Sequence, residues 1–291
     1  MSSEASFPDG GVLAVGADDG HVAAGGVRYR VRRLGSAFPP PGGEDAREAV
    51  DEWPAAPAAL LLHDVAGDLA DWDVLARELA ADRVALAVAP KGLGGSEDRA
   101  PYTGAALAGE LAALVLHAVD GPVDVVGHGT GATLAWNLAA HRPDLVRRVV
   151  LISGGRALPP WTVAWLLADV TIGRGRPPAG RRAGGFAGGA GTGQAGGPAE
   201  LGEAAHRGRI RAAYARLGQS GQISPQRALV LWGTRDMVSP LATGQRIVAT
   251  LTRSVHPETV RMVTLPGVGH APLTDSPGRC AALVAEFLRA P

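Results

Sequence analysis

Residues 125–132, Val-Val-Gly-His-Gly-Thr-Gly-Ala, have the form of a turn that carries a catalytic nucleophile. An apolar run typical of a strand enters a turn framed by glycines, and a helix-like run follows, as in the Gly-x-Ser-x-Gly pattern. The central position is Gly129, which has no side chain with which to attack a substrate. Thr130 has a hydroxyl group, but it stands one position further on, where side chains normally point away from the pocket.

The same turn has two other interpretations. Gly127, Gly129 and Ala132 also fit the dinucleotide-binding pattern Gly-x-Gly-x-x-Gly/Ala. That pattern needs an acidic residue at the end of the next strand to bind a ribose, whereas the run at 149–153 continues into Gly-Gly-Arg. We therefore disfavour a nucleotide as ligand, and a turn with a purely structural role stays open as an alternative.

An acid and a base follow later strand-like runs. Asp236 comes just after the run at 228–232, and His270 comes just after the run at 260–265. Because ligands bind at the carboxyl ends of strands in open parallel sheets, we expect both side chains to converge with Gly129 at one edge. An Asp that accepts a hydrogen bond from a His fixes the tautomer of the ring and raises its basicity. The pair therefore predicts a general base or acid that works near neutral pH, unless both residues are inherited and idle.

The elements that would position these residues alternate along the chain. Short apolar runs typical of buried strands are followed by helix-like runs, which predicts an α/β fold with a mostly parallel sheet flanked by helices. Residues 1–20 read as a frayed terminus, 21–34 as strand and 35–57 as a loop. Beyond them, the predicted strands are 58–63, 84–89, 123–127, 149–153, 228–232 and 260–265. The predicted helices are 72–81, 104–119, 132–140, 241–251 and 281–289.

The segment 155–225 interrupts this alternation and divides the core into residues 1–154 and 226–291. It opens with an apolar helix-like run that carries Trp161 and Trp165, continues through a glycine-rich stretch, and closes with a charged helix at about 200–217. A glycine-rich stretch gains too little from burial to offset its ordering entropy, so we expect part of this segment to be disordered. Its position in the chain predicts a partial lid over the ligand-binding edge of the sheet, and a loop without a role is the alternative.

The composition argues against several classes of protein and site. The 28 basic and 28 acidic residues give a formal net charge of zero, so nothing favours nucleic acid or an anionic membrane surface as a partner. The single cysteine, Cys280, allows no intramolecular disulfide and no cysteine metal cluster. The sequence shows neither a secretory signal nor an apolar run long enough to span a membrane. We therefore expect a cytoplasmic protein that acts on a small molecule without a metal or organic cofactor.

Taken together, several stretches resemble the α/β-hydrolase superfamily, in the lidded branch that includes epoxide hydrolases, haloalkane dehalogenases and small esterases. Three motifs of that branch are a strand and His-Gly loop that helps build the oxyanion hole, a strand followed by Gly-x-Gly-x-Ser, and the nucleophile elbow with its helix. They are matched by residues 61–72, 84–98 and 125–152. The resemblance implies that Gly129, Asp236 and His270 stand at the positions of nucleophile, acid and base.

Three positions depart from the pattern that this resemblance implies. Gly129 stands where the superfamily carries Ser, Asp or Cys, so no acyl- or alkyl-enzyme can form there. Asp64 stands where the superfamily usually has glycine beside the oxyanion hole, and a carboxylate there would repel an oxyanion. Ala89 stands where the superfamily often has Asp. Because Asp64 and Ala89 depart independently, they argue against Gly129 being an engineered replacement.

These observations predict an atypical enzyme that acts on a small, largely apolar organic molecule. His270, with Asp236, would act as acid or base on substrate or water, and Asp64 would be a second titratable group beside the vacated space. The reaction would be an isomerisation, elimination, dehydration or cyclisation, or a hydrolysis by activated water without a covalent intermediate. A catalytically inactive relative that binds a ligand or serves as a scaffold is the alternative. Candidate contacts to the substrate are Gly129, His128, Thr130, His63, Trp161 and Trp165.

Overall fold

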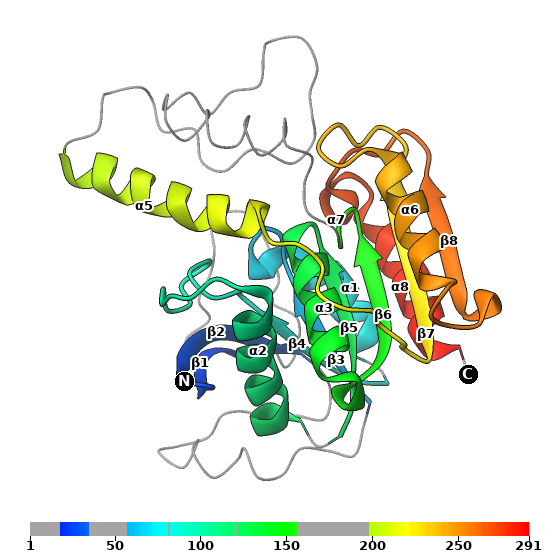
Figure 1. The fold of residues 1–291 in the computed structure, drawn as a ribbon, viewed down its shortest axis with the longest axis horizontal. Helices are drawn as coiled ribbons and strands as arrows, with labels where there is room; N and C mark the ends of the chain where they lie inside the picture. Colours follow the sequence, from blue (N-terminus) through cyan, green and yellow to red (C-terminus); the bar gives the residue numbers. More distant parts are fainter. Residues whose placement is uncertain (1–17, 35–56, 81, 120, 156–197, 291) are drawn as a thin grey trace, which may run out of the picture.

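The computed structural model describes residues 18–34, 57–80, 82–119, 121–155 and 198–290. Their strands are β1 (Asp18–Ala24), β2 (Val27–Leu34), β3 (Ala58–Leu62), β4 (Val84–Val88), β5 (Val123–His128), β6 (Val146–Ile152), β7 (Arg227–Gly233) and β8 (Val260–Leu265). They form one sheet in the order β1-β2-β4-β3-β5-β6-β7-β8 (Figure 1). Strand β2 is antiparallel to both neighbours, and β3 to β8 are parallel to one another.

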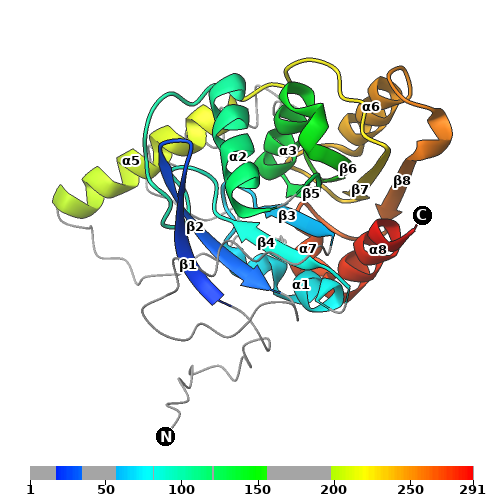
Figure 2. The ribbon, with the colours of Figure 1, turned by 90° about the horizontal axis from the view of Figure 1, so that it is seen from below.

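Helices cover the sheet on both faces, as Figure 2 shows. On one face lie α2 (Gly104–Ala118), α3 (Thr130–His141) and α6 (Leu241–Leu251), and on the other lie α1 (Asp73–Leu79) and α8 (Pro277–Arg289). The remaining helices are α5 (Pro198–Ala215), the short α7 (Pro272–Asp275) and the 3-10 turns Leu69–Trp72, Pro143–Leu145 and Pro257–Thr259. The predicted mostly parallel α/β architecture is therefore confirmed.

Successive residues of each central strand point into different cores. Leu60 and Leu62 of β3 contribute to the core under α2 and α3, whereas Ala59 and Leu61 contribute to the core under α1 and α8. All of β3 is buried as a result. This double coverage is the reason that the parallel strands are continuous apolar runs in the sequence instead of alternating polar and apolar residues.

The N-terminal strand prediction at 21–34 is wrong in one respect. The structure divides this region into β1 and β2, which pair as an antiparallel hairpin, and β1 begins at Asp18, inside the segment predicted to be frayed. The turn between them consists of Gly25 and Gly26, both with positive φ (59° and 78°). A two-residue turn of this kind needs positive φ, which glycine adopts without steric cost. The Gly-Gly pair was the available signal for a hairpin at this point.

Other predicted boundaries shift by a few residues. The helix predicted at 72–81 is preceded by a 3-10 turn that Asp68 caps, and α1 itself ends at Leu79. The helix predicted at 281–289 starts four residues earlier, at Pro277. The predicted helix with Trp161 and Trp165, and the glycine-rich stretch after it, lie outside the described residues.

The charged helix predicted at 200–217 is α5. It lies on the side to which the carboxyl ends of the parallel strands point, and its N-terminal end extends outward beyond the sheet (Figure 1). The hydroxyl group of Tyr214, near the end of α5, is buried and donates a hydrogen bond to the carbonyl oxygen of Lys91 (2.8 Å), in the loop after β4. Within the described segments, no helix combines the length and apolar character that crossing a membrane requires.

Candidate active site

The turn between β5 and α3 has the conformation of a nucleophile elbow. Gly129, at its centre, has φ 57° and ψ −117°, a backbone conformation that residues other than glycine rarely adopt. The residues two positions before and after it are glycines for a steric reason. A Cβ at Gly127 would lie 2.3 Å from the carbonyl oxygen of Gly131, and one at Gly131 would lie 2.0 Å from that of Leu62. This contact brings the end of β3 against the elbow, together with Asp64, which lies two residues beyond the strand.

The carboxyl group of Asp64 fills the space that a side chain at position 129 would occupy. A Cβ built on Gly129 would lie 2.3 Å from Asp64 Oδ1 and 2.4 Å from Asp64 Cγ. Both distances are far below van der Waals contact. Gly129 and Asp64, which the sequence presents as two independent departures, therefore form one steric unit.

The hydrogen-bond donors of the elbow bind this carboxylate. Asp64 Oδ1 accepts hydrogen bonds from the Thr130 backbone N–H (2.8 Å) and from the Thr130 hydroxyl group (2.9 Å). The hydroxyl oxygen in turn accepts a hydrogen bond from the Val65 backbone N–H (3.0 Å). An oxyanion hole is built from the N–H after the nucleophile and an N–H of the loop after β3. Here the Thr130 N–H already binds an anion of the chain itself.

The predicted acid–base pair is formed. The Nδ1 atom of His270, in the loop after β8, lies 2.8 Å from Asp236 Oδ2, in the loop after β7. The other oxygen of Asp236 accepts hydrogen bonds from the backbone N–H groups of Val238 (2.9 Å) and Ser239 (2.8 Å). These bonds fix the carboxylate so that His270 donates from Nδ1, which leaves Nε2 directed to the opposite side.

Asp64 lies on that opposite side. The distance from His270 Nε2 to Asp64 Oδ2 is 3.8 Å, which is longer than a hydrogen bond. The side chains of Asp64 and His270 are 10% and 9% exposed, whereas that of Asp236 is fully buried. The site is thus a row of carboxylate, imidazole and carboxylate, with the Asp64–His270 gap at its accessible end.

The pKa values of the two accessible groups move apart. Burial by itself would lower the pKa of His270, but the hydrogen bond and charge of Asp236, together with the charge of Asp64, raise it above the ordinary 6.5. Burial would raise the pKa of Asp64, but His270, His128 and the hydrogen bonds from Thr130 lower it below the ordinary value. The charged forms of Asp64 and His270 therefore stabilise each other.

His128 and His63, predicted to lie at the site, hold the surrounding backbone. His128 Nε2 donates a hydrogen bond to the carbonyl oxygen of His270 (2.8 Å), and the two rings are 5.4 Å apart between centroids. His63 is fully buried, with Nδ1 2.6 Å from the carbonyl oxygen of Asp64. Burial is the main cause that lowers the pKa of both imidazoles, so both are neutral near neutral pH. Trp161 and Trp165 lie outside the described residues.

Two features of the site could not be read from the sequence. The sequence presents Thr130 as a possible substitute nucleophile or substrate contact, but its backbone and hydroxyl groups hold Asp64. Ser153, at the end of β6, is buried in a left-handed conformation with φ 49°, and its hydroxyl group has no hydrogen-bond partner among the described residues. Neither a serine after a strand nor a threonine after a glycine indicates such an environment in a sequence.

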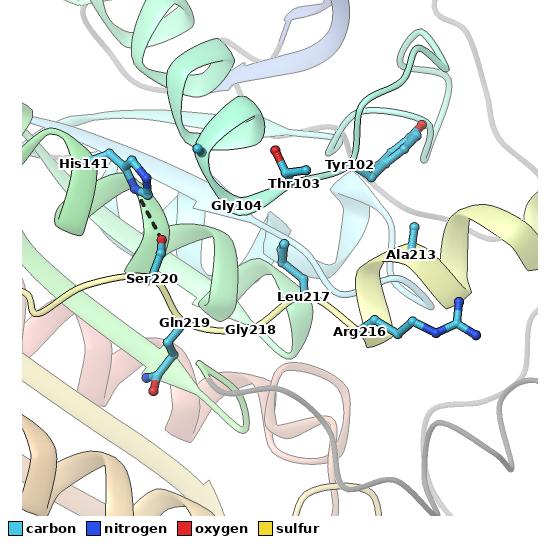
Figure 3. A pocket seen from close by; sticks show the side chains of 11 residues that line it. Tyr102, Thr103, Gly104, His141, Ala213, Arg216, Leu217, Gly218, Gln219 and Ser220 are labelled. Carbon is cyan, nitrogen blue, oxygen red and sulfur yellow. Dashed lines mark hydrogen bonds between the residues drawn. The ribbon is translucent and has the colours of Figure 1, made fainter.

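A separate surface pocket lies between the start of α2 and the end of α5 (Figure 3), with a volume of about 470 Å³. Ser220 and His141 meet there with Oγ and Nδ1 3.4 Å apart. His141 Nδ1 already donates a hydrogen bond to the carbonyl oxygen of Asn137 (2.8 Å), so this nitrogen has no lone pair to activate the serine. The pocket contains none of Asp64, Asp236 and His270, and we assign it no catalytic role.

The part of the chain that the structure describes contains no candidate metal site built from its own side chains. None of its histidine, cysteine and acidic side chains form a group of three or more with the geometry to hold an ion. The arrangement of Asp64, His270 and Asp236 can instead donate, accept and transfer protons.

Comparisons with known proteins bear on the fold and the family of this chain. Lipase LipV of Mycobacterium tuberculosis is 42% identical over 108 residues, a match of 36% of this chain and 40% of that lipase, so the chain spans less than half of its length. A hydrolase structure from Pseudomonas aeruginosa PA01 aligns with TM-score 0.66 and 20% identity over 94% of this chain and 99% of the other. The enol-lactonase of Burkholderia xenovorans LB400 aligns with TM-score 0.65 and 18% identity over 93% and 100%. At these identities the two structures show the fold alone.

The model of the Alpha/beta hydrolase family matches residues 59–283, which is most of the chain. The protein therefore belongs to the alpha/beta hydrolase family.

Proposed function

We propose that this protein is an enzyme that acts on a small, largely apolar organic molecule by acid–base chemistry, without a covalent bond at the elbow. The observation that carries the proposal is the position of the Asp64 carboxylate. It lies in the space of the missing nucleophile side chain and faces His270 Nε2 at 3.8 Å. Two groups that exchange protons are thus directed at the point where the covalent chemistry of the family takes place.

In this proposal His270 and Asp64 divide the proton transfers. Asp236 holds the His270 ring and stabilises its protonated form. Protonated His270 donates from Nε2, and Asp64 accepts a proton through Oδ2 while Thr130 holds Oδ1. A substrate or a water molecule between them could lose a proton on one side and gain one on the other. Isomerisation, elimination, cyclisation and hydrolysis by activated water are the reaction types that such a pair supports.

We also propose that residues 155–225 form a partial lid over this site. Helix α5, the helix of this segment that the structure describes, lies on the side of the carboxyl ends of the parallel strands (Figure 1). A lid in that place would exclude water from the gap between Asp64 and His270 and would set the size of the substrate.

A proton-transfer assay tests the proposed function without knowledge of the product. Small neutral ketones, lactones and hydroxy ketones would be incubated with the protein in D2O and followed by NMR for deuterium uptake at carbon and for new products. We expect turnover that falls by about 10²- to 10⁴-fold in His270→Gln, the usual contribution of a general acid or base. The matched control is His256→Gln, because the side chain of His256 is 83% exposed and remote from the site.

Two results would contradict the proposal. Turnover that survives His270→Gln would remove the imidazole from the mechanism. A substrate-derived mass increase of the protein during turnover would show a covalent intermediate.

The second candidate function is binding without turnover. It is favoured by one observation, that the Thr130 backbone N–H, one donor of the oxyanion hole, is already bound to Asp64. A protein of this kind would bind members of the same panel and shift the NMR signals of His270, while no member would exchange deuterium or react.

A further inference from the structure

The two sides of the gap between Asp64 and His270 differ in the hydrogen-bonding groups that they present. This difference limits the class of substrate that the gap can bind. At the elbow of a conventional member of the family, backbone donors face the substrate and attract a carbonyl oxygen. In this chain the Thr130 N–H and hydroxyl groups are turned to Asp64 Oδ1, and the Val65 N–H is bound to the Thr130 hydroxyl oxygen. An acceptor, Asp64 Oδ2, faces the substrate in their place.

The opposite wall of the gap supplies a donor. His270 Nδ1 is bound to Asp236, so only Nε2 faces the gap. Asp236 and Asp64 raise the pKa of His270 against the effect of burial, which shifts the balance toward the protonated ring with a hydrogen on Nε2. His128, which also adjoins Asp64, is kept neutral by burial and adds no positive charge. Two carboxylates then flank a single imidazolium, and the site has an excess of negative charge.

The spacing of the two walls fits one small polar atom. With Asp64 Oδ2 and His270 Nε2 separated by 3.8 Å, a single oxygen can lie at about 2.8 Å from each, the usual length of a hydrogen bond. A hydroxyl oxygen at that point donates its hydrogen to Asp64 and accepts the hydrogen of His270. An ester or ketone oxygen can accept from His270, but it has no hydrogen for Asp64 and places its lone pairs against a carboxylate.

We propose that the site recognises a neutral substrate by a hydroxyl group, of an alcohol or an enol, that bridges Asp64 Oδ2 and His270 Nε2. Carboxylates and esters are disfavoured in the same position. The inference rests on the proposed function only in placing the substrate between these two side chains. It concerns binding, so it can be tested whether or not turnover is observed.

The test compares three probes that share a phenyl ring and differ in their polar group: benzyl alcohol, methyl benzoate and benzoate. Dissociation constants would be measured by NMR titration of the His270 ring signals, which are assigned by their absence in His270→Gln. We expect wild-type protein to bind benzyl alcohol at least about 10-fold more tightly than methyl benzoate or benzoate, a difference of about 1.4 kcal/mol. Equal or tighter binding of the ester or the carboxylate, or no response of His270 to any probe, would overturn the inference.

The variant Asp64→Gly should invert this preference for the alcohol over the carboxylate. It removes the carboxylate and releases the Thr130 N–H and hydroxyl donors next to His270. We expect this variant to bind benzoate more tightly than benzyl alcohol, by about 10-fold. An unchanged preference for the alcohol would show that Asp64 does not determine the selectivity.

Asp64→Asn covers the case in which the glycine variant does not fold. The amide keeps the shape of the side chain and an oxygen for Thr130 but loses the charge, so discrimination against benzoate should fall at least about 3-fold, or roughly 0.7 kcal/mol. Discrimination that stays unchanged counts against the inference. A hydroxyl preference with no turnover in the deuterium assay would contradict the proposed function alone, whereas turnover of esters without binding of the alcohol would contradict this inference alone.

Discussion

At position 129, a side chain and the Asp64 carboxylate compete for the same space. We predict that Gly129→Ser alone destabilises the protein by about 2–5 kcal/mol, because it combines a strained positive φ with an overpacked contact. Combining it with Asp64→Gly should recover part of this loss, since the colliding carboxylate is then absent. The free energies of unfolding of wild type, both single variants and the double variant form the cycle that measures the coupling.

The control for this cycle is Gly278→Ser, because a Cβ at Gly278 meets no atom within 4 Å. A Gly129→Ser variant as stable as wild type would show that Asp64 moves aside at little cost. The double variant also has a serine beside the His270–Asp236 pair, with the Thr130 N–H released. We expect a fluorophosphonate to label Ser at position 129 in the double variant and not in Gly129→Ser, as mass spectrometry would detect.

His270 makes stability depend on pH in a direction that its environment fixes. Its pKa in the folded state is raised above 6.5. The contribution of protonated His270 to the free energy of unfolding is therefore complete below about pH 6.5. It is lost as the pH rises through the raised pKa of His270 in the folded state. We predict that the melting temperature of wild type exceeds that of His270→Gln by more at pH 6 than at pH 9. A difference that grows with pH would contradict the assignment, and the exposed His256→Gln variant should show no such trend.

At the scale of elements, a buried charge cluster joins the sheet to the last helix. Asp124 of β5 is fully buried and pairs with Arg83 (2.9 Å), just before β4, and with Arg147 of β6 (2.7 Å). Arg83 also donates to the carbonyl oxygen of Leu288 (3.0 Å) near the end of α8. The cluster thus satisfies carbonyl groups that the helix end leaves without partners.

Removing the carboxylate should leave these guanidinium groups uncompensated. We predict that Asp124→Asn lowers the free energy of unfolding by about 3–5 kcal/mol, the usual effect of breaking a buried ion pair. Chemical denaturation would measure the loss. The control is Asp144→Asn, which breaks the exposed pair with Arg142 and should leave stability unchanged within error. Equal effects of the two substitutions would show that the cluster is a minor contributor.

Elements of this molecule differ in how well the sequence predicts them. Leu241–Leu251 and Val260–Leu265 are predicted to the residue, because apolar spacing and flanking turn residues mark both ends. The prediction of a single strand misses the hairpin of β1 and β2, although the apolar–polar alternation changes phase at the Gly25–Gly26 turn, from Val22 and Ala24 to Val27, Tyr29 and Val31. Short strands with continuous apolar sequence are recognisable because the helices on both faces bury them.

At the scale of the whole molecule, the sequence predicts which residues gather and leaves open how they face one another. The meeting of Asp236 and His270 follows from the rule that the carboxyl ends of parallel strands share an edge. The direction of the Asp64 side chain does not follow from any such rule. It depends on the close packing of the end of β3 on the elbow at Gly131, which is a tertiary contact between segments over 60 residues apart in the chain.

The occupied space at the elbow also limits which residues positions 64 and 129 can carry together. With the Asp64 carboxylate in its present position, a serine at position 129 would collide with it, so the two side chains exclude each other in this arrangement. A serine introduced at position 129 alone meets the carboxylate. Asp64→Gly alone leaves neither a nucleophile nor a carboxylate at the elbow. The contact therefore makes positions 64 and 129 interdependent, and restoring a serine with free hydrogen-bond donors at the elbow requires changes at both.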